Sequence, residues 1–271
     1  MTRRFLTYGP LLIYAMIVIF PIANMVLLSF KSLDGIVSYP LGWPTHWYFS
    51  NFIEAWQEGN LGRYLINTAV VTLLSVAGII LFSSMAAYAI ARFEFRGNQG
   101  IYLLFLAGLA LPIQMIAVPL FILMHQLNLL NQLSSVVLIY VASGLSFSVF
   151  LLVNFIRNIP KDLEEAAFLD GASPIQVYWH IILPLIRPSL SIVTVLNFIA
   201  AWNNFFFPLI LLTSPSKMTI AVGVMSFVGQ YSTQWNLLLA ALVIVTLPAM
   251  VVFGLMSRQF VRNMMAGAIK L

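Results

Sequence analysis

The side chains that could do chemistry in this sequence are concentrated in residues 157–188, a polar segment of an otherwise apolar chain. Asp162, Glu164 and Glu165 stand together there, and Asp170 follows shortly after them. Carboxylates at this spacing suit the first turn of a short helix, because the helix dipole favours negative charge at its N-terminus. The chain has no cysteine and no His-Glu-x-x-His pattern, so we expect this segment to bind a partner and not to catalyse a metal-dependent reaction.

Signals for two short helices surround these carboxylates. Pro160 is predicted as the first residue of one helix, and Gly171 as the left-handed residue that ends it. Ser173 and Gln176 have the spacing of a capping box, which predicts a second helix that stops before Pro184. Two helices joined by a glycine elbow would give a rigid surface for a soluble partner. The alternative is an interfacial helix that lies on the lipid surface.

The rest of the sequence predicts an all-α integral membrane protein. Of its 271 residues 61% are hydrophobic and 8% are charged, whereas soluble domains are roughly 25% charged. Apolar runs of about 20 residues predict six transmembrane helices. Their approximate ranges are 10–30, 66–91, 100–124, 134–156, 189–212 and 236–256. The first run is too long for the core of a signal peptide and lacks a small-residue cleavage pattern, so we expect it to be retained.

The distribution of basic residues predicts the orientation in the membrane. With both termini in the cytoplasm (N-in, C-in), only Lys31, Arg63 and Lys217 of the 13 Lys and Arg residues lie outside. Residues 157–188 then face the cytoplasm. The basic residues form no cluster, so the net charge of +5 does not indicate nucleic-acid binding.

The predicted spans contain no Asp, Glu, Lys or Arg, which are the groups that ion-coupled transporters usually place inside the membrane. No Gly-x-x-x-x-Gly-Lys phosphate loop is present either, so energy for uphill transport would come from a partner. A secondary transporter or channel that works without an ATPase stays open as an alternative. A membrane-embedded enzyme is a third hypothesis, but the hydroxyl-rich run Ser143–Ser148 has no histidine or carboxylate partner.

The polar segment carries Glu165-Ala166-Ala167-x-x-x-Gly171 and then Ile181-x-Leu183-Pro184. This pattern resembles the EAA motif of inner-membrane permease subunits of ABC importers, and the neighbouring Ile159-Pro160-x-Asp162-Leu163 is similar to their carbohydrate-type, maltose-permease-like branch. Further matches run through most of the chain: Asn67, Ala86–Arg92, Pro112, Ile116–Leu120, Trp202-Asn203, Leu247-Pro248 and Gly267-Ala268-x-Lys270.

The resemblance implies the type I ABC importer permease fold. Residues 1–65 would hold the N-terminal tail, the first transmembrane helix and an outer segment. Residues 66–271 would form a five-helix permease core, with residues 157–188 as the cytoplasmic coupling segment. The residues implied to couple to the ATPase are Glu164, Glu165, Ala166, Ala167, Asp170, Gly171, Ile181, Leu183 and Pro184.

The same resemblance implies the partners of a multi-pass protein of the bacterial inner membrane. They are a second, non-identical permease subunit, two ABC ATPase subunits, an extracytoplasmic solute-binding protein and the membrane lipid. ATP and Mg would be bound by the ATPase subunits, and we expect no cofactor or metal on this chain. The transported solute would be a sugar, a polyol or glycerol phosphate, which the pattern does not distinguish.

Two further groups of residues are candidates for contact with the solute or its carrier. Gln114, Trp202, Asn203 and Asn204 could line the solute pathway, because a Trp beside two amides suits stacking on and hydrogen bonding to a sugar. The alternative is hydrogen bonding between helices. The related permeases usually carry an acidic residue at the position of Asn204. Gln230, Tyr231, Ser232 and Thr233 would form a loop that reaches the binding protein, or else an ordinary polar connector.

Overall fold

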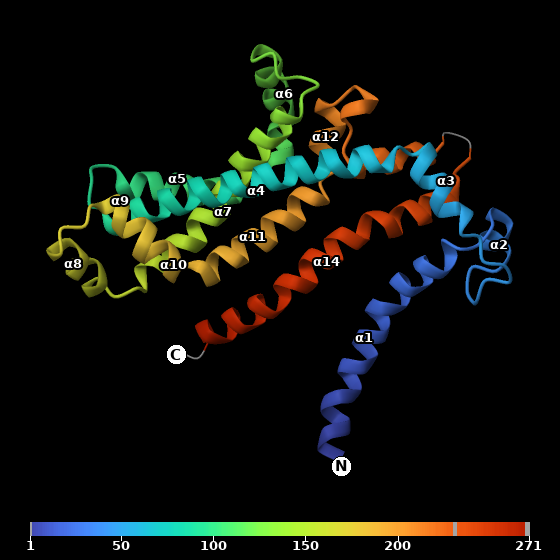
Figure 1. Ribbon diagram of the computed structural model, residues 1–271, viewed down its shortest axis with the longest axis horizontal. Helices are drawn as coiled ribbons and strands as arrows, with labels where there is room; N and C mark the ends of the chain where they lie inside the picture. Colours follow the sequence, from blue (N-terminus) through green and yellow to red (C-terminus); the bar gives the residue numbers. More distant parts are fainter. Residues whose placement is uncertain (1, 230–231, 269–271) are drawn as a thin grey trace. The chain divides into compact units, whose positions relative to one another are not determined.

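The computed structural model describes the backbone of residues 2–229 and 232–268, and side chains within residues 8–229 and 232–255. In these ranges the chain is helical, and its β-structure is a single antiparallel bridge between Val228 and Thr233 (Figure 1). The helices are α1 (Thr2–Leu28), α2 (Leu33–Ser38), α3 (Ser50–Glu58), α4 (Leu61–Arg92), α5 (Asn98–Ala110), η1 (Ile113–Ile116), α6 (Ala117–Gln126), α7 (Leu133–Arg157), α8 (Asp162–Leu169), α9 (Pro174–Val177), η2 (Tyr178–Ile182), α10 (Leu183–Leu185), α11 (Arg187–Trp202), α12 (Phe206–Leu211), η3 (Pro215–Lys217), α13 (Ile220–Gly223), η4 (Val224–Phe227) and α14 (Trp235–Ala268).

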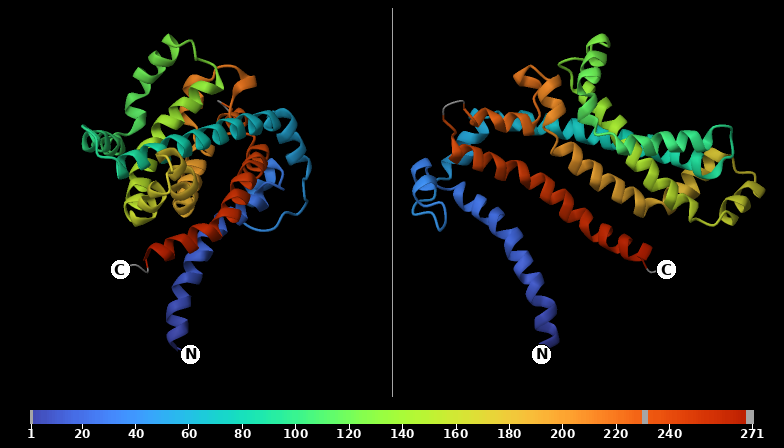
Figure 2. Two further views of the ribbon diagram at one scale, coloured as in Figure 1. Left: turned by 60° about the vertical axis from the view of Figure 1, so that its left-hand side comes forward. Right: turned by 180° about the vertical axis from the view of Figure 1, so that it is seen from behind.

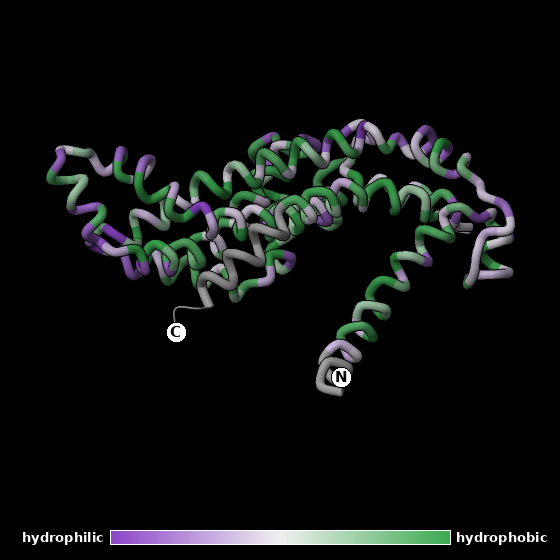
Figure 3. Tube along the Cα trace, turned by 60° about the horizontal axis from the view of Figure 1, so that its bottom comes forward, coloured by the Kyte–Doolittle hydropathy of each residue, from purple (hydrophilic) through white to green (hydrophobic). Residues whose placement is uncertain are grey.

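The predicted number of membrane spans is confirmed when bent helices are counted as single spans. Among the described residues, four stretches are long and apolar enough to cross a membrane: Tyr8–Leu28, Leu61–Arg92, Leu133–Arg157 and Trp235–Leu255. Two further pairs of helices also qualify, but each pair is bent at a short break: Asn98–Ala110 with Ile113–Gln126, and Pro174–Leu185 with Arg187–Trp202. Apolar residues predominate along the long helices, and hydrophilic residues gather at the turns between them (Figure 3).

The third predicted run, 100–124, is not one straight helix. α5 ends at Ala110, and the chain turns by 94° before η1 and α6 continue. Leu111 and Pro112 are both extended, with ψ angles of 115° and 116°. Proline has no N–H to donate and disfavours a helical conformation in the residue before it, which explains the break at this dipeptide.

The fifth predicted run, 189–212, is also interrupted. α11 already starts at Arg187 and ends at Trp202, and the shorter α12 begins at Phe206. Asn204 Oδ1 accepts a hydrogen bond from the backbone N–H of Phe207 at 3.3 Å, so its side chain satisfies a free donor in the first turn of α12. An asparagine that serves the start of a new helix explains why the apolar run does not continue as one helix.

The chain divides into two compact units. One comprises the described residues of Met1–Leu65 and Thr219–Pro248, and the other those of Ile66–Met218 and Ala249–Leu271. One boundary between the units falls after residue 65, and residues 219–248 group with the N-terminal part of the chain. The division into residues 1–65 and a permease core of residues 66–271 stays a prediction.

Helix α7 is central to the larger unit. α5 and α11 lie beside it (Figure 2). α4 contributes Ile79, Ala87, Tyr88 and Ile90 to the buried cluster that α7 also joins. Gly144 of α7 allows this close approach, because a Cβ there would stand 2.4 Å from Ile79 Cδ1 and 2.6 Å from Asn197 Oδ1. Small residues at helix contacts serve the same purpose in membrane proteins generally. Residues of the coupling segment, among them Val177, Tyr178 and Ile182, pack into this same cluster.

Candidate functional site

The first helix of the coupling segment is α8, with Asp162, Glu164 and Glu165 in its first turn, as predicted. The helix begins at Asp162, and Lys161 is its N-cap residue. Pro160 therefore precedes the helix, and the prediction that it is the first helical residue is wrong. The three carboxylates, without a capping side chain from Lys161, provide the negative charge that an N-terminus favours.

Gly171 ends α8 in the left-handed conformation, as predicted, with φ of +85°. The N–H of Gly171 donates to Phe168 O at 3.0 Å, and that of Ala172 to Ala167 O at 2.9 Å. These two bonds form a Schellman motif, which fixes the direction of the chain as it leaves a helix. No atom lies within 4 Å of a Cβ built on Gly171, so glycine is required here by the backbone angle and not by crowding.

The second helix starts at the predicted capping box but does not stop where predicted. The Ser173 side chain accepts from Gln176 N, and the Gln176 side chain accepts from Ser173 N. After α9 the chain continues through the π-helical η2, in which Leu183 N–H donates to Tyr178 O, and then through α10. Pro184 lies inside this continuous run, and the chain bends by 74° only at Ile186. The π turn is a known site of local adjustment, and it accommodates the ring and the missing N–H of Pro184.

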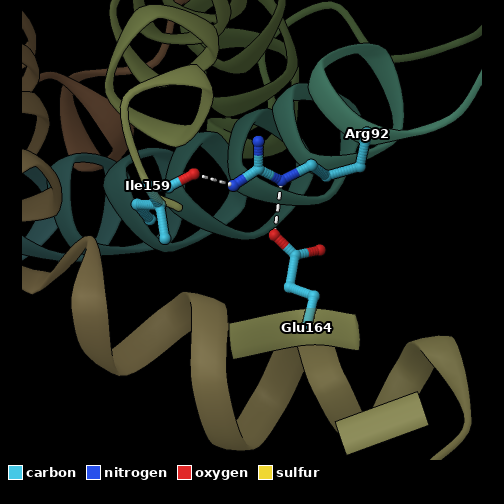
Figure 4. Close-up of polar contacts among 3 residues, drawn as sticks. All are labelled: Arg92, Ile159 and Glu164. Carbon is cyan, nitrogen blue, oxygen red and sulfur yellow. Dashed lines mark hydrogen bonds and ion pairs between the residues drawn. The ribbon is translucent and has the colours of Figure 1, made fainter. Parts of the chain in front are cut away.

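A buried ion pair attaches α8 to the end of α4 (Figure 4). Arg92, the last residue of α4, donates from Nε to Glu164 Oε1 at 2.5 Å and from Nη2 to Ile159 O at 2.8 Å. Both charged side chains are only 6% exposed. Glu164 therefore points inward and holds α8 in place, and its coupling of this chain to the ATPase stays a prediction. In the sequence Arg92 stands out only as the end of the segment Ala86–Arg92, since nothing there pairs it with a carboxylate 72 residues away.

Most of the remaining surface of α8 is exposed, and its large exposed side chains are apolar. Leu163, Phe168 and Leu169 are 48%, 41% and 89% exposed, and Glu165 and Ala166 lie exposed between them. Asp170 and Gly171 at the end of the helix are exposed as well. Exposed large apolar side chains around a carboxylate, on a helix that is anchored from behind, have the composition of a protein-binding surface.

The second half of the motif, residues 181–184, helps to attach the coupling segment to the membrane helices. Ile181 and Leu183 pack against the buried cluster of α4 and α7, as does Ala167 of α8. Tyr178 is buried and its hydroxyl lies 2.7 Å from Ser84 Oγ of α4. Pro184 is half-buried. Of the nine predicted coupling residues, Ile181 and Leu183 thus pack against the chain's own core, whereas Glu165, Ala166, Asp170 and Gly171 are exposed.

Comparison with known proteins identifies the family of this chain. Residues 79–265 match the family described as the binding-protein-dependent transport system inner membrane component. The chain belongs to this family. It is therefore a non-catalytic membrane component of a transport system, located in the inner membrane, and not an enzyme.

Individual relatives cover nearly the whole chain. The diacetylchitobiose uptake system permease protein of Streptomyces coelicolor is 34% identical over 99% of this chain and 90% of that protein. A probable starch degradation products transport system permease of Thermoanaerobacterium thermosulfurigenes is 33% identical over 89% of this chain and 88% of that protein. A crystal structure of a bacterial ABC transporter involved in alginate import has a TM-score of 0.85 at 22% identity, covering 96% of both chains, which shows the same fold.

The predicted solute-pathway residues of this inner membrane component have different surroundings. Gln114 in η1 and Asn203 after α11 are exposed, and Asn204 is half-buried with its side chain on α12. Trp202 is only 5% exposed and stacks on Phe198 with ring centroids 5.4 Å apart. Its ring faces protein, so contact with a sugar would require the ring to move.

The predicted binding-protein loop is described in part. Gln230 and Tyr231 lie outside the described residues. Ser232 is exposed, and Thr233 forms the bridge to Val228. Gly229 N–H donates to Ser232 O at 3.0 Å, and Gln234 N–H to Phe227 O at 3.0 Å, so the two ends of this loop are joined.

Proposed function

We propose that this chain is one of two permease subunits of an ABC importer for a saccharide or a related polyol. It forms half of the translocation pathway and contributes no energy of its own. Two ABC ATPase subunits bind ATP and Mg, and they act on the chain through the coupling segment. An extracytoplasmic solute-binding protein delivers the solute, and the second permease subunit completes the pathway within the lipid bilayer.

The exposed face of α8 is the observation that carries this proposal. A short helix with Leu163, Phe168 and Leu169 exposed would cost free energy in water unless a partner covers it. The Arg92–Glu164 pair and the Schellman motif at Gly171 hold that face rigidly on the transmembrane core. A rigid connection of this kind transmits a displacement of the partner to the membrane helices. Orientation with both termini in the cytoplasm places the face on the side where ATP is available.

A saccharide is the solute class that the relatives favour. Their names refer to diacetylchitobiose and to products of starch degradation, which are carbohydrates. In this chain Gln114, Asn203 and Asn204 offer amide groups, which can donate and accept hydrogen bonds to hydroxyls. The loop with Gln230, Tyr231, Ser232 and Thr233 would act on the binding protein from the outer side.

Purification of the native complex tests the proposal. A tag on this chain should recover a second permease subunit, an ABC ATPase and a solute-binding protein, and the ligand released from that binding protein should be a saccharide or polyol. Recovery of the chain without an ATPase would contradict the coupling role. Recovery of the complex with an amino acid or a metal in the binding protein would leave the coupling role intact and contradict the solute class.

A further inference from the structure

The outer segment that follows α1 contains a buried lysine with no carboxylate partner. Lys31 is 5% exposed, three residues after the end of α1. Its Nζ donates to the backbone oxygen of Tyr39 at 2.6 Å. No Asp or Glu oxygen of the described residues lies within 4.0 Å of this nitrogen. The ion pair found in the described part of the chain joins Arg92 and Glu164 and does not involve Lys31.

The position of Lys31 is fixed from several sides. Asn51 of α3 is 3% exposed and donates from Nδ2 to Ser29 O and to Lys31 O, each at 2.9 Å. Phe30 is enclosed by aromatic rings: the centroids of Trp47 and Phe52 lie 5.1 and 4.8 Å from its own. The lysine is therefore held in a folded segment of the outer side, and it is not a mobile side chain that reached the interior by chance.

An ammonium group has three N–H donors, and the carbonyl of Tyr39 uses one of them. A buried charge without an oppositely charged partner is expensive, so natural proteins pair such groups or bring a ligand to them. Lys31 lines a pocket of about 50 Å³, together with Tyr39, Trp43, Thr45 and His46. Sites for sugar-sized molecules measure roughly 300–1,000 Å³, so this pocket suits a single small group.

We propose that this pocket binds a carboxylate side chain of the extracytoplasmic solute-binding protein. The inference rests on the proposed function, which places such a protein on this side of the membrane. The Lys31 ammonium supplies the complementary charge. Around the pocket, Tyr39, Leu41 and Trp43 are 72%, 66% and 77% exposed, which gives the aromatic and apolar surroundings of a protein contact. A buried charge pair within such a rim fixes the orientation of a partner as well as its affinity.

Titration of the reconstituted complex with the binding protein tests this inference. Lys31→Met should raise the concentration that gives half-maximal stimulation of ATP hydrolysis by about tenfold, and it should flatten the dependence of that concentration on salt. Basal ATP hydrolysis and the maximal stimulated rate should stay unchanged. Lys217→Met is the matched control, because Lys217 Nζ makes the same kind of contact, with Asn131 O at 2.6 Å. An equal effect of both substitutions would mean a general loss of outer charge and would overturn the inference.

A second pair of variants keeps the lysine in place. Thr45→Glu puts a carboxylate at the same pocket, where it competes with that of the partner, whereas Thr45→Gln adds the same volume without charge. We expect the affinity for the binding protein to fall at least fivefold in Thr45→Glu and to be little changed in Thr45→Gln. This comparison holds even if Lys31→Met disturbs the fold of the outer segment.

The failures of the two proposals are distinguishable. A wild-type complex that no binding protein stimulates would contradict the proposed function itself. A stimulated wild type with unchanged affinities in Lys31→Met and Thr45→Glu would contradict the inference alone. If these variants instead alter activity only in liposomes that contain anionic phospholipid, the pocket binds a lipid phosphate and the inference is overturned.

Discussion

Two adjacent glutamates of α8 have opposite surroundings, and this difference decides what each does. Glu164 is 4% exposed and paired with Arg92, whereas Glu165, the next residue, is exposed. Removing one partner of a buried ion pair leaves the other charge uncompensated, at a cost of about 3–5 kcal/mol. An exposed carboxylate carries no such cost. The pair Glu164–Arg92 is therefore a structural anchor, and Glu165 is free to contact a partner.

Substitution of the anchor should destabilise the protein. We expect Glu164→Gln and Arg92→Met each to lower the midpoint of thermal unfolding of the detergent-purified chain by several degrees, from a loss of about 3 kcal/mol. The double variant Arg92→Met with Glu164→Met should recover most of this loss, because no unpaired charge remains. Asp162→Asn, at an exposed position of the same first turn, is the control and should change the midpoint little. Unchanged midpoints in both single variants would show that the pair does not hold α8.

Substitution of the exposed Glu165 should leave the thermal stability nearly unchanged but abolish binding of the ATPase. Glu165→Arg places a cation in the first turn of α8, where it is unfavourable by only about 0.3–1 kcal/mol, so the thermal midpoint should be nearly that of the wild type. The ATPase should no longer co-purify, because the surface that it meets has reversed its charge. An ATPase that stays bound to Glu165→Arg would mean that the exposed face of α8 is not its binding surface.

The motif can be predicted from the sequence, but the different roles of Glu164 and Glu165 cannot. The pattern Glu165-Ala166-Ala167-x-x-x-Gly171 is visible in the sequence, and so are the helix caps, because caps depend on residues a few positions apart. The partner of Glu164 depends on tertiary packing and is not. The same applies to Lys31, which the sequence shows only as one outer basic residue among three.

At the scale of elements, the glycine elbow between α8 and α9 controls the angle at which the coupling segment leaves the core. Gly171 has φ of +85° and open space around its Cβ position. A side chain there cannot clash, so any effect of substitution comes from the backbone. A β-branched residue is strongly disfavoured at such an angle, whereas asparagine tolerates it.

Gly171→Val should therefore uncouple the subunits while Gly171→Asn should not. We expect stimulated ATP hydrolysis of the reconstituted complex to fall at least tenfold in Gly171→Val and less than threefold in Gly171→Asn. Both variants should insert normally, since the residue is exposed outside the long apolar helices. Equal rates in the two variants would show that the left-handed conformation is not required for coupling.

The long helices show what a pattern of hydrophobic residues can and cannot predict. Runs of hydrophobic residues identify the segments that cross the membrane, but they do not show where a segment bends. The break at Leu111-Pro112 follows from proline chemistry, yet Pro21 and Pro248 lie inside the continuous helices α1 and α14. A proline alone therefore does not decide between a break and a helix. In the fifth run the break follows from the side chain of Asn204, which no hydropathy pattern records.

At the scale of the whole molecule, orientation determines which partner can meet which surface. The chain has no cysteine, so single cysteines can be introduced without background labelling. Ser173 and Ser232 are both exposed, and the proposed orientation places the first in the cytoplasm and the second outside. We expect a membrane-impermeant thiol reagent added to intact cells to label Ser232→Cys and not Ser173→Cys. Labelling of Ser173→Cys from outside would reverse the orientation and remove both the ATPase surface and the Lys31 pocket from their proposed partners.

Energy supply is the central claim about the molecule as a whole. The described membrane-spanning segments carry no carboxylate that could couple transport to an ion gradient. The anchored α8 instead offers a binding surface for the proposed ATPase. ATP-driven solute uptake into liposomes tests this most directly, with the purified complex compared with this chain alone. We predict that the complex, supplied with its binding protein and with ATP on the ATPase side, accumulates the solute. The chain alone should not accumulate it under any ion gradient. Uptake by the chain alone, without ATP or the ATPase, would contradict the account.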